Sequence, residues 1–419
     1  MKALLAELQE AFTTSDLIFS LLAEEDFFER PIALRHPFVF YLGHLPAFAW
    51  NQLGRGVLGL QSENPFFDQL FERGIDPADQ GSTPPEVAWP PLPEVRAYRD
   101  RVRALLPQLA AELATIADDP LAENGRVLAL ILEHEQMHQE TLLYMFQERD
   151  PRHIRWPATL PSPQGGEGRL ANPMEIPAGE VTLGARWVEL PFGWDNEFEQ
   201  EHHHLPPFQI NSLPVRNQDW LDFFTISGDP SLWPVPWLRL DGQLCVKTVA
   251  GPVPFGMASG WPVQVSGVQA RVYCAAKGGR LPTEAELRRA ALGTQSGTQR
   301  PYPWGEALPE KVSGNFAFRH WFPVPVGDCP ESSSAFGVEE LVGNGWEWSS
   351  SPFRPLAGFR PWARSYPGYS ADFFDDDHDV VVGASWATAT RLLRPSFRNW
   401  YRRGYPYVFS SFRVCWDSR

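Results

Sequence analysis

The pattern of apolar residues changes near residue 150, and this change predicts two consecutive domains of different structure. Before it, apolar residues recur at the spacings of amphipathic helices. After it, Gly and Pro are frequent, strands look short, and most of the 17 Trp residues occur. A chain of 419 residues also exceeds the usual size of one core. We therefore predict a helical domain over residues 1–150, a Pro- and Gly-rich linker over 151–171, and a second domain over 172–419.

Four stretches of the first domain carry the helical pattern. The N-terminal stretch is amphipathic, and HPFVFYLGHLPAFAWNQL (36–53) is apolar on nearly every side, which indicates a buried helix. Two more helices are predicted over 92–113 and 120–147, after a long Pro-rich connection over 63–91. Four helices with one long crossover favour a four-helix bundle.

Helices are predicted at two places in the second domain. One follows Leu213, and the other begins at Thr283, where Glu286 three residues later completes a capping box. The remainder of this domain is expected to consist of short strands and loops packed around aromatic residues.

Residues His134 to His138 read H-E-x-x-H, a pattern typical of zinc proteases. Two histidines four residues apart on a helix share one face and can bind the same cation. No further protease ligand follows at the expected distance, and His44 on the second predicted helix is a better third ligand. Three neutral imidazoles with open positions suit a catalytic site, for which zinc and ferrous iron both remain open.

Adjacent histidines also occur at His202, His203 and His204. In a strand, neighbouring side chains point to alternating faces, so these three cannot all reach one ion. We expect them to have a structural role near the start of the second domain.

Composition excludes several classes of function. The net charge is −15, and no run of basic residues provides the footprint that nucleic acid requires. The four Cys residues are scattered without a C-x-x-C pair, so no disulfide framework is predicted. No apolar stretch approaches the length of a membrane span, and the N-terminal apolar run contains acidic residues, unlike a signal peptide. We therefore expect a soluble cytoplasmic protein that binds neither nucleic acid nor a membrane.

Five ordered motifs in the second domain resemble those of formylglycine-generating-enzyme-like domains, which have a C-type-lectin-like core. The motifs are MEIPAGEVTLGA, GGRLPTEAELRRAA, GNGWEWSSSPF, GASWATATRLLRPSFRNW and SFRVC. The resemblance implies an α+β chain in which most of these residues form the scaffold. Formylglycine-generating enzymes use a pair of cysteines near the C-terminus, but only Cys415 lies in this region. We therefore do not expect formylglycine generation.

A DinB-type four-helix bundle with three histidines, fused to such a domain, resembles the non-haem iron sulfoxide-synthase family. Ergothioneine synthases of this family use O2 to join sulfur to hercynine, and the related selenoneine synthases join selenium from a selenosugar. The resemblance implies Fe(II) as cofactor, held by His44, His134 and His138, with small molecules as the partners.

The same resemblance assigns roles in the second domain. The stretch Tyr366 to Ser370, which precedes GASW, matches a Y-x-x-Y-S motif. It implies Tyr366 as the tyrosine near the metal that donates a proton or a hydrogen atom to reduced dioxygen, with Tyr369 as the second candidate. The stretch FRNW (397–400) implies a substrate-binding segment that includes Arg398, Asn399 and Trp400. Within it, the Asn399 amide is expected to contact the carboxylate of hercynine, and the Trp400 ring its trimethylammonium group.

Departures from the ergothioneine synthases favour one branch of the family. Some of those enzymes have Asp where this chain has Tyr401, and glutamines where it has Phe48 and Met137. A pocket with these residues is poorly suited to γ-glutamylcysteine, so the sequence favours a selenosugar donor. Phe48 and Tyr401 are candidate substrate-binding residues, but the sequence does not specify which residues recognise the donor. Carbon–sulfur bond formation with a thiol is the alternative. A zinc hydrolase using Glu135 and a binding module without catalysis are two further hypotheses.

Overall fold

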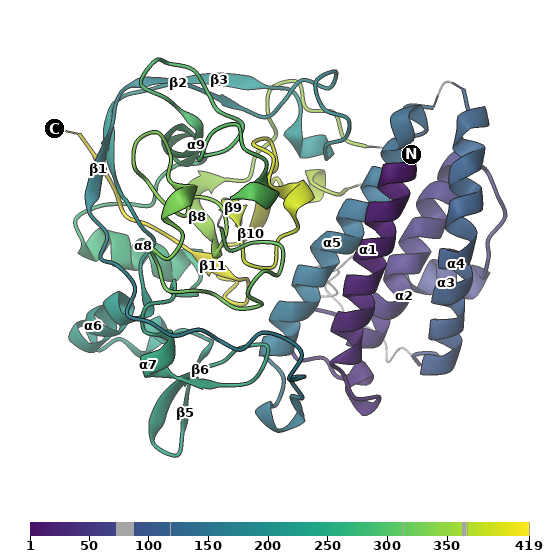
Figure 1. Cartoon of the computed structure of the whole chain (residues 1–419), viewed down its shortest axis with the longest axis horizontal. Coiled ribbons are helices and arrows are strands. Elements are labelled where there is room, and N and C mark those ends of the chain that lie inside the picture. Colours follow the sequence, from purple (N-terminus) through teal and green to yellow (C-terminus); the bar gives the residue numbers. More distant parts are fainter. Residues whose placement is uncertain (73–87, 118, 313, 363–365, 367, 419) are drawn as a thin grey trace. The chain divides into compact units, whose positions relative to one another are not determined.

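The computed structural model describes residues 1–72, 88–117, 119–312, 314–362, 366 and 368–418 (Figure 1). The chain divides into two compact units, Met1–Pro157 and Ala158–Arg419. The boundary lies inside the predicted linker. The α+β fold class predicted from the sequence, with a helical first domain and a second domain of mixed helices and strands, is confirmed.

The first unit is helical. Helix α1 packs against α5, and α2 packs against both α4 and α5 (Figure 1). The helices are α1 (Lys2–Ser20), α2 (Phe38–Ala49), α3 (Pro65–Leu70), α4 (Leu92–Glu112) and α5 (Arg126–Gln147). Short 3₁₀ turns occur at η1 (Glu25–Phe28), η4 (Leu113–Thr115), η5 (Glu123–Gly125) and η6 (Pro151–His153), and α2 continues as a π-helical stretch, η2 (Trp50–Val57).

Helix α2 is the buried helix that its composition predicts, because every one of its 12 residues is buried. Helix α5 begins later than predicted, since Asn124 and Gly125 both have positive φ angles, 54° and 72°, which end the preceding turn. The short helix α3 was not predicted within the connection over 63–91, although Asn64 caps it and Pro65 occupies its first turn. Residues 73–87 of this connection lie outside the described part of the chain.

The described residues of the second unit contain the two predicted helices and two more α-helices. They are α6 (Asn217–Ser227), α7 (Phe255–Ala258), α8 (Gly267–Ala276) and α9 (Glu284–Leu292). At the start of α9, the Thr283 hydroxyl accepts a hydrogen bond from the Glu286 amide while the Glu286 carboxylate accepts one from the Thr283 amide. The capping box predicted from the sequence is thus present.

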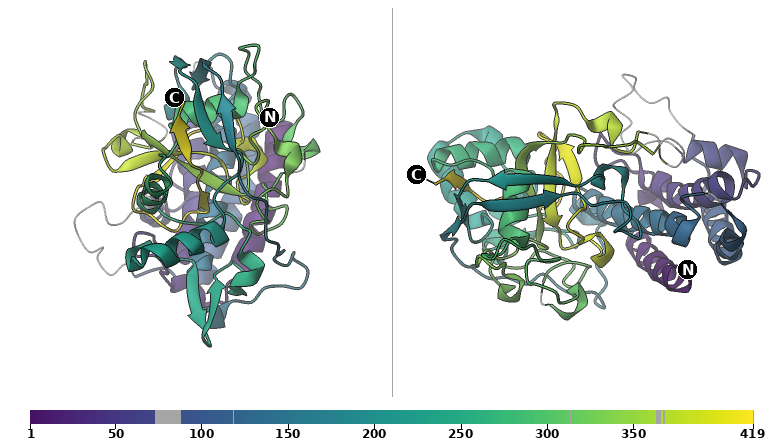
Figure 2. Two further views of the ribbon diagram at one scale, coloured as in Figure 1. Left: turned by 90° about the vertical axis from the view of Figure 1, so that its left-hand side faces the viewer. Right: turned by 90° about the horizontal axis from the view of Figure 1, so that it is seen from above.

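The strands in the described residues of this unit form four small sheets. Figure 2 shows two further views of these strands. In the largest, ordered β10-β9-β8-β11, the long strands β8 and β9 are antiparallel and β11 is parallel to β8. The other sheets are β1-β4-β12, β2-β3 and β5-β6-β7. The strands are β1 (Pro173–Ile176), β2 (Gly179–Leu183), β3 (Glu201–Leu205), β4 (Phe208–Asn211), β5 (Trp237–Leu240), β6 (Gln243–Val246), β7 (Val253–Pro254), β8 (Gly345–Pro352), β9 (His378–Ala384), β10 (Asn399–Arg402), β11 (Ser410–Ser411) and β12 (Cys415–Asp417). Further 3₁₀ turns are η7 (Asp195–Glu197), η8 (Pro230–Leu232), η9 (Pro309–Lys311), η10 (Pro330–Ser332), η11 (Ala371–Phe373) and η12 (Thr390–Leu392).

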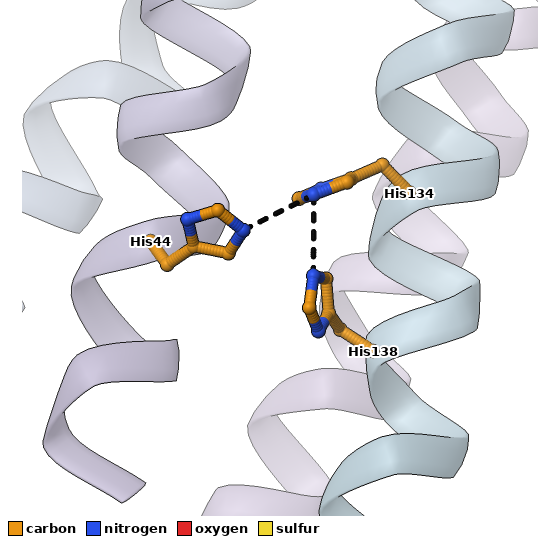
Figure 3. A group of neighbouring side chains, drawn as sticks. All are labelled: His44, His134 and His138. Atoms are coloured by element: carbon orange, nitrogen blue, oxygen red, sulfur yellow. Dashed lines mark hydrogen bonds between the residues drawn. The ribbon is translucent and has the colours of Figure 1, made fainter. Parts of the chain in front are cut away.

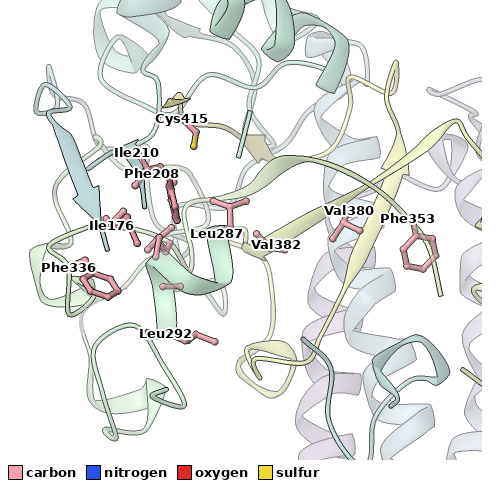
Figure 4. Packing of buried hydrophobic residues seen from close by; sticks show 14 residues of the cluster. Ile176, Phe208, Ile210, Leu287, Leu292, Phe336, Phe353, Val380, Val382 and Cys415 are labelled. Atoms are coloured by element: carbon pink, nitrogen blue, oxygen red, sulfur yellow. The ribbon is translucent and has the colours of Figure 1, made fainter. Parts of the chain in front are cut away.

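The core of the second unit lies where α9 packs on β8 and β9 (Figure 4). Leu287 from the helix and Val380 and Val382 from β9 belong to one buried cluster. Cys415 is fully buried in the same cluster, and its thiol is free. Burial raises its pKa to about 12, which makes it a poor nucleophile. Cys415 is therefore part of the core of the second unit.

Tryptophans fill the interior of the second unit as predicted. Trp346, Trp348 and Trp386 are each at most 1% exposed. The indole of Trp348 donates a hydrogen bond to the Val265 carbonyl, 2.9 Å away. No helix in the described ranges is both long and apolar enough to cross a lipid bilayer.

Candidate metal centre

His44 on α2 faces His134 and His138 on α5, and the three imidazoles converge (Figure 3). The Nε2 atom of His134 lies 3.2 Å from Nε2 of His44 and 3.2 Å from Nε2 of His138. The ligand atoms of all three lie within 4.8 Å of one another. The structure therefore brings together the three residues that the sequence singled out.

These separations fit a bound metal ion. With metal–nitrogen bonds of about 2.1 Å and angles of about 100° between them, neighbouring ligand atoms are about 3.2 Å apart. Two of the three pairs already have this spacing, so one cation could be held with little rearrangement. Three ligands leave further coordination positions for substrates.

The protonation of the imidazoles also suits a metal. All three side chains are at most 3% exposed, and desolvation lowers the pKa of His44 to about 4. Burial lowers the pKa values of His134 and His138 well below 6.5, and the neighbouring imidazoles lower them further. The rings are therefore neutral at pH 7, and each has a lone pair to offer.

A backbone contact fixes the orientation of His44. Its Nδ1 atom lies 2.6 Å from the carbonyl oxygen of Phe71 and donates a hydrogen bond to it. The proton is thus on Nδ1, which leaves the Nε2 lone pair directed at the other two histidines. Such a partner on the far ring nitrogen is typical of metal-binding histidines.

Aromatic rings surround the imidazoles. Phe48 stacks face to face on His134, with ring centroids 3.6 Å apart and planes 8° apart. Phe40 stacks on His44 at 5.0 Å, and Tyr41 lies 5.5 Å from His138. These contacts restrict the rotation of the ligands and give the centre an apolar wall.

Glu135 lies on a different side of α5 from the two histidines. Its carboxylate pairs with Arg103 at 3.4 Å, and Ser15 donates a hydrogen bond to it. A zinc hydrolase would need this carboxylate next to the metal as a base. The observed contacts weigh against that hypothesis.

Other histidines are placed differently. On β3, His203 pairs with Glu201 and His204 pairs with Glu180 across to β2, which leaves these residues on the surface. A second group with closely spaced ligand atoms consists of Asp26, Glu29 and His153, but Asp26 is already paired with Arg149.

The predicted tyrosines lie on a turn of the second unit. The Tyr369 amide donates to the Tyr366 carbonyl at 3.1 Å, and their rings are 5.2 Å apart. Burial raises the pKa of Tyr366 to about 12. The Tyr369 ring stacks on Trp194 at 4.2 Å and meets Trp400 edge-on at 5.2 Å.

The predicted substrate residues of the second unit belong to β10 and the segment before it. Trp400 stacks on Phe353 at 4.2 Å, so one face of its indole is covered. The ring of Tyr401 is parallel to that of Tyr405 at 5.8 Å. Asn399 is partly buried at the start of the strand.

Arg398 makes its contacts within the domain. Its guanidinium pairs with Glu284 at 2.9 Å and donates to the carbonyls of Asn196 and Arg354. The side chain is 4% exposed. Arg398 thus links the segments that contain Asn196, Glu284 and Arg354. A contact between Arg398 and the substrate stays a prediction.

Sequence reasoning missed four residues that contact the predicted site residues. Phe40 and Phe71 support His44. Trp194 and Asp195 adjoin the turn that contains Tyr366, Tyr369 and Ser370, which we call the tyrosine turn. Phe40 is four residues before His44, a helical spacing that could have identified it. The other three are distant in sequence from their partners and carry no such signal.

Comparison with protein families assigns both units. Residues 158–418 match the sulfatase-modifying factor enzyme 1-like domain, and residues 7–142 match the DinB superfamily.

Relatives match across both units. Ergothioneine biosynthesis protein 1 of Neurospora crassa is 32% identical, over 95% of this chain and 56% of the relative. The hercynine oxygenase of Mycolicibacterium smegmatis is 34% identical over 84% of each protein. That of Mycobacterium tuberculosis is 35% identical, over 82% of this chain and 87% of the relative. The chain thus spans little more than half of the fungal relative and most of the mycobacterial ones.

Proposed function

Because this chain belongs to the family of hercynine oxygenases and ergothioneine biosynthesis proteins, we propose that it is an O2-dependent non-haem iron enzyme acting on hercynine. The reaction joins a chalcogen atom to C2 of the imidazole ring. The observation that carries the proposal is the set of three neutral imidazoles on α2 and α5, which could hold a cation and would leave coordination positions open for substrates.

With a thiol donor the reaction balances as one oxidation. Hercynine loses the hydrogen on C2, the thiol loses its hydrogen, and O2 accepts four electrons. One oxygen atom ends in the sulfoxide and the other in water. The new carbon–sulfur bond and the sulfur–oxygen bond each account for two of the four electrons.

The residues of the first unit hold the ion and shape its surroundings. His44, His134 and His138 would bind Fe(II), which supplies the electron transfer to O2. The Phe71 carbonyl keeps the Nε2 lone pair of His44 available, and Phe48 restrains His134. The paired Glu135 takes no part.

The residues of the second unit have roles consistent with their chemistry. Tyr366 is the proposed proton donor, and its raised pKa keeps the phenol protonated at neutral pH. Tyr369 is the second candidate for this role. The Asn399 amide is proposed to hold the carboxylate of hercynine, and the Trp400 indole its trimethylammonium group.

The donor is proposed to be a thiol, because the relatives are ergothioneine proteins and hercynine oxygenases. The names of these relatives support carbon–sulfur bond formation with a thiol better than the selenosugar donor that the sequence favours. The selenium reaction remains a prediction that rests on Phe48, Met137 and Tyr401. Phe48, which stacks on His134, has no side-chain group that could form a hydrogen bond with a peptide-like thiol. For this reason a selenosugar is included among the donors to be tested.

The test compares wild-type protein with His138→Ala after loading with Fe(II). We expect wild type to convert hercynine and a thiol into an adduct only when O2 is present, and the variant to retain neither iron nor activity. His204→Ala, which removes an exposed imidazole of β3, is the matched control and should remain active. Turnover without O2, or activity that survives His138→Ala, would contradict the proposal.

A further inference from the structure

The tyrosine turn of the second unit is held by a segment about 170 residues earlier in the chain. The Ser370 hydroxyl donates a hydrogen bond to the Asp195 carboxylate, whose other oxygen accepts from the Trp362 amide at 3.4 Å. Next to Asp195, the indole of Trp194 stacks on Tyr369 at 4.2 Å, with planes 24° apart.

These contacts reach Tyr366 through the turn itself. Tyr369 donates to the Tyr366 carbonyl, and Gly368 between them has a φ of 74°, which glycine adopts without strain. Fixing Tyr369 and Ser370 therefore also fixes the backbone of Tyr366. The Tyr366 ring lies 6.5 Å from Trp194.

The earlier segment is itself firmly anchored. Glu197, two residues after Asp195, accepts a hydrogen bond from the Trp194 amide at 2.7 Å. Its carboxylate also pairs with Arg394 and accepts from the Ser396 hydroxyl at 2.6 Å. Asp195 and Trp194 thus present a carboxylate and an indole from a rigid turn.

This arrangement is costly for stability. Asp195 is 2% exposed, and desolvation raises its pKa. The neighbouring Asn196 is fully buried, and neither polar atom of its side chain has a partner in the described structure. Buried groups of this kind are selected against unless they serve a purpose beyond folding.

We propose that Asp195 and Trp194 are positioning residues for Tyr366. They hold the tyrosine turn so that the phenol is placed for proton delivery. This inference rests on the proposed function, in which Tyr366 is the proton donor.

Two single variants break the same contact from opposite sides. Asp195→Asn replaces one of the two acceptors of the carboxylate with a donor, and Ser370→Ala removes the hydroxyl. The matched control is Asp376→Asn, an acid further along the same loop whose side chain is 88% exposed. Each protein is loaded with Fe(II), and iron content and thermal unfolding are measured first.

Kinetics give the main readout. We expect kcat to fall about tenfold to a hundredfold in each single variant while KM for hercynine stays unchanged, because a misplaced catalytic group slows chemistry more than binding. The effect of D2O on kcat should increase, since proton delivery becomes slower. The double variant should lose no more than the worse single variant, as expected for one shared contact.

Hydrogen exchange gives a readout that does not depend on activity. The amides of residues 366 and 368–374 should exchange faster in both variants and at the wild-type rate in Asp376→Asn. Wild-type kcat in both variants would overturn the inference, whether or not exchange becomes faster. A lower kcat with wild-type exchange and an unchanged D2O effect would overturn it as well. Wild-type protein that forms no adduct would refute the proposed function and this inference with it, whereas an active wild type with unaffected variants refutes the inference alone.

Discussion

Binding of a divalent metal at pH 6 should release almost no protons, although the ligands are three histidines. Ordinary imidazoles with a pKa near 6.5 would be about three-quarters protonated at this pH, so three of them would release about two protons on binding a metal. In this protein desolvation lowers the pKa of His44 to about 4, at which only about 1% of that ring is protonated at pH 6. His134 and His138 are shifted in the same direction.

The proton count can be measured by calorimetry with Zn(II), which is inert to O2. Titrations of metal-free protein in two buffers of different ionisation enthalpy give the number of protons released. His138→Ala should abolish the one-to-one binding event. His204→Ala should leave it unchanged and reveals any contribution from the exposed histidines of β3. Release of about two protons, lost in His138→Ala, would refute the conclusion that the imidazoles are neutral before the metal binds.

Three further predictions concern other parts of the chain. Cys274, Cys329 and Cys415 are buried with pKa values raised to about 12, so native protein should leave them unlabelled by a thiol reagent at pH 8, and rapid labelling in absorbance assays would contradict this. Burial raises the pKa of Glu340 to about 7, so the folded protein holds this proton at higher pH than the unfolded chain does. Stability should therefore fall by about 3 kcal/mol as pH rises from about 4.5 to 7, and denaturation of Glu340→Gln should show a smaller fall. Phe48→Gln should weaken metal binding about twofold to tenfold, because the stack on His134 is lost. The same variant should use γ-glutamylcysteine better relative to a selenosugar. A wild-type metal affinity by calorimetry and a wild-type ratio of products would contradict these two effects.

The three histidines of the candidate metal centre could be predicted from the sequence because their signals are local. His134 and His138 are four apart on a strongly periodic helix, and His44 lies in a helix that is apolar on every side, where an unpaired imidazole would be unfavourable. Helical spacing thus identified His134 and His138 as candidate ligands. That the three histidines converge, at 3.2 Å, depends on how α2 packs on α5, which no local pattern specifies.

The supports of the site could not be predicted for the same reason. The Phe71 carbonyl meets His44 from 27 residues away, and Asp195 meets Ser370 from 175 residues away. Contacts over such separations depend on tertiary packing. The late start of α5 was missed for a different reason, because Asn124 adopts a left-handed conformation within a stretch that otherwise has a helical pattern.

The most direct test of the proposed function is a competition among donors. Fe(II)-loaded protein would receive hercynine in air with equal amounts of γ-glutamylcysteine, cysteine and 1-selenoglucose, and mass spectrometry would identify the adduct. We predict a hercynine–sulfur sulfoxide that is absent without O2 and absent in His138→Ala. A hercynine–selenium adduct would agree with the proposed metal centre and reaction class but would show that the donor is a selenosugar and not a thiol. No adduct from any donor would contradict the assignment of this centre to chalcogen transfer.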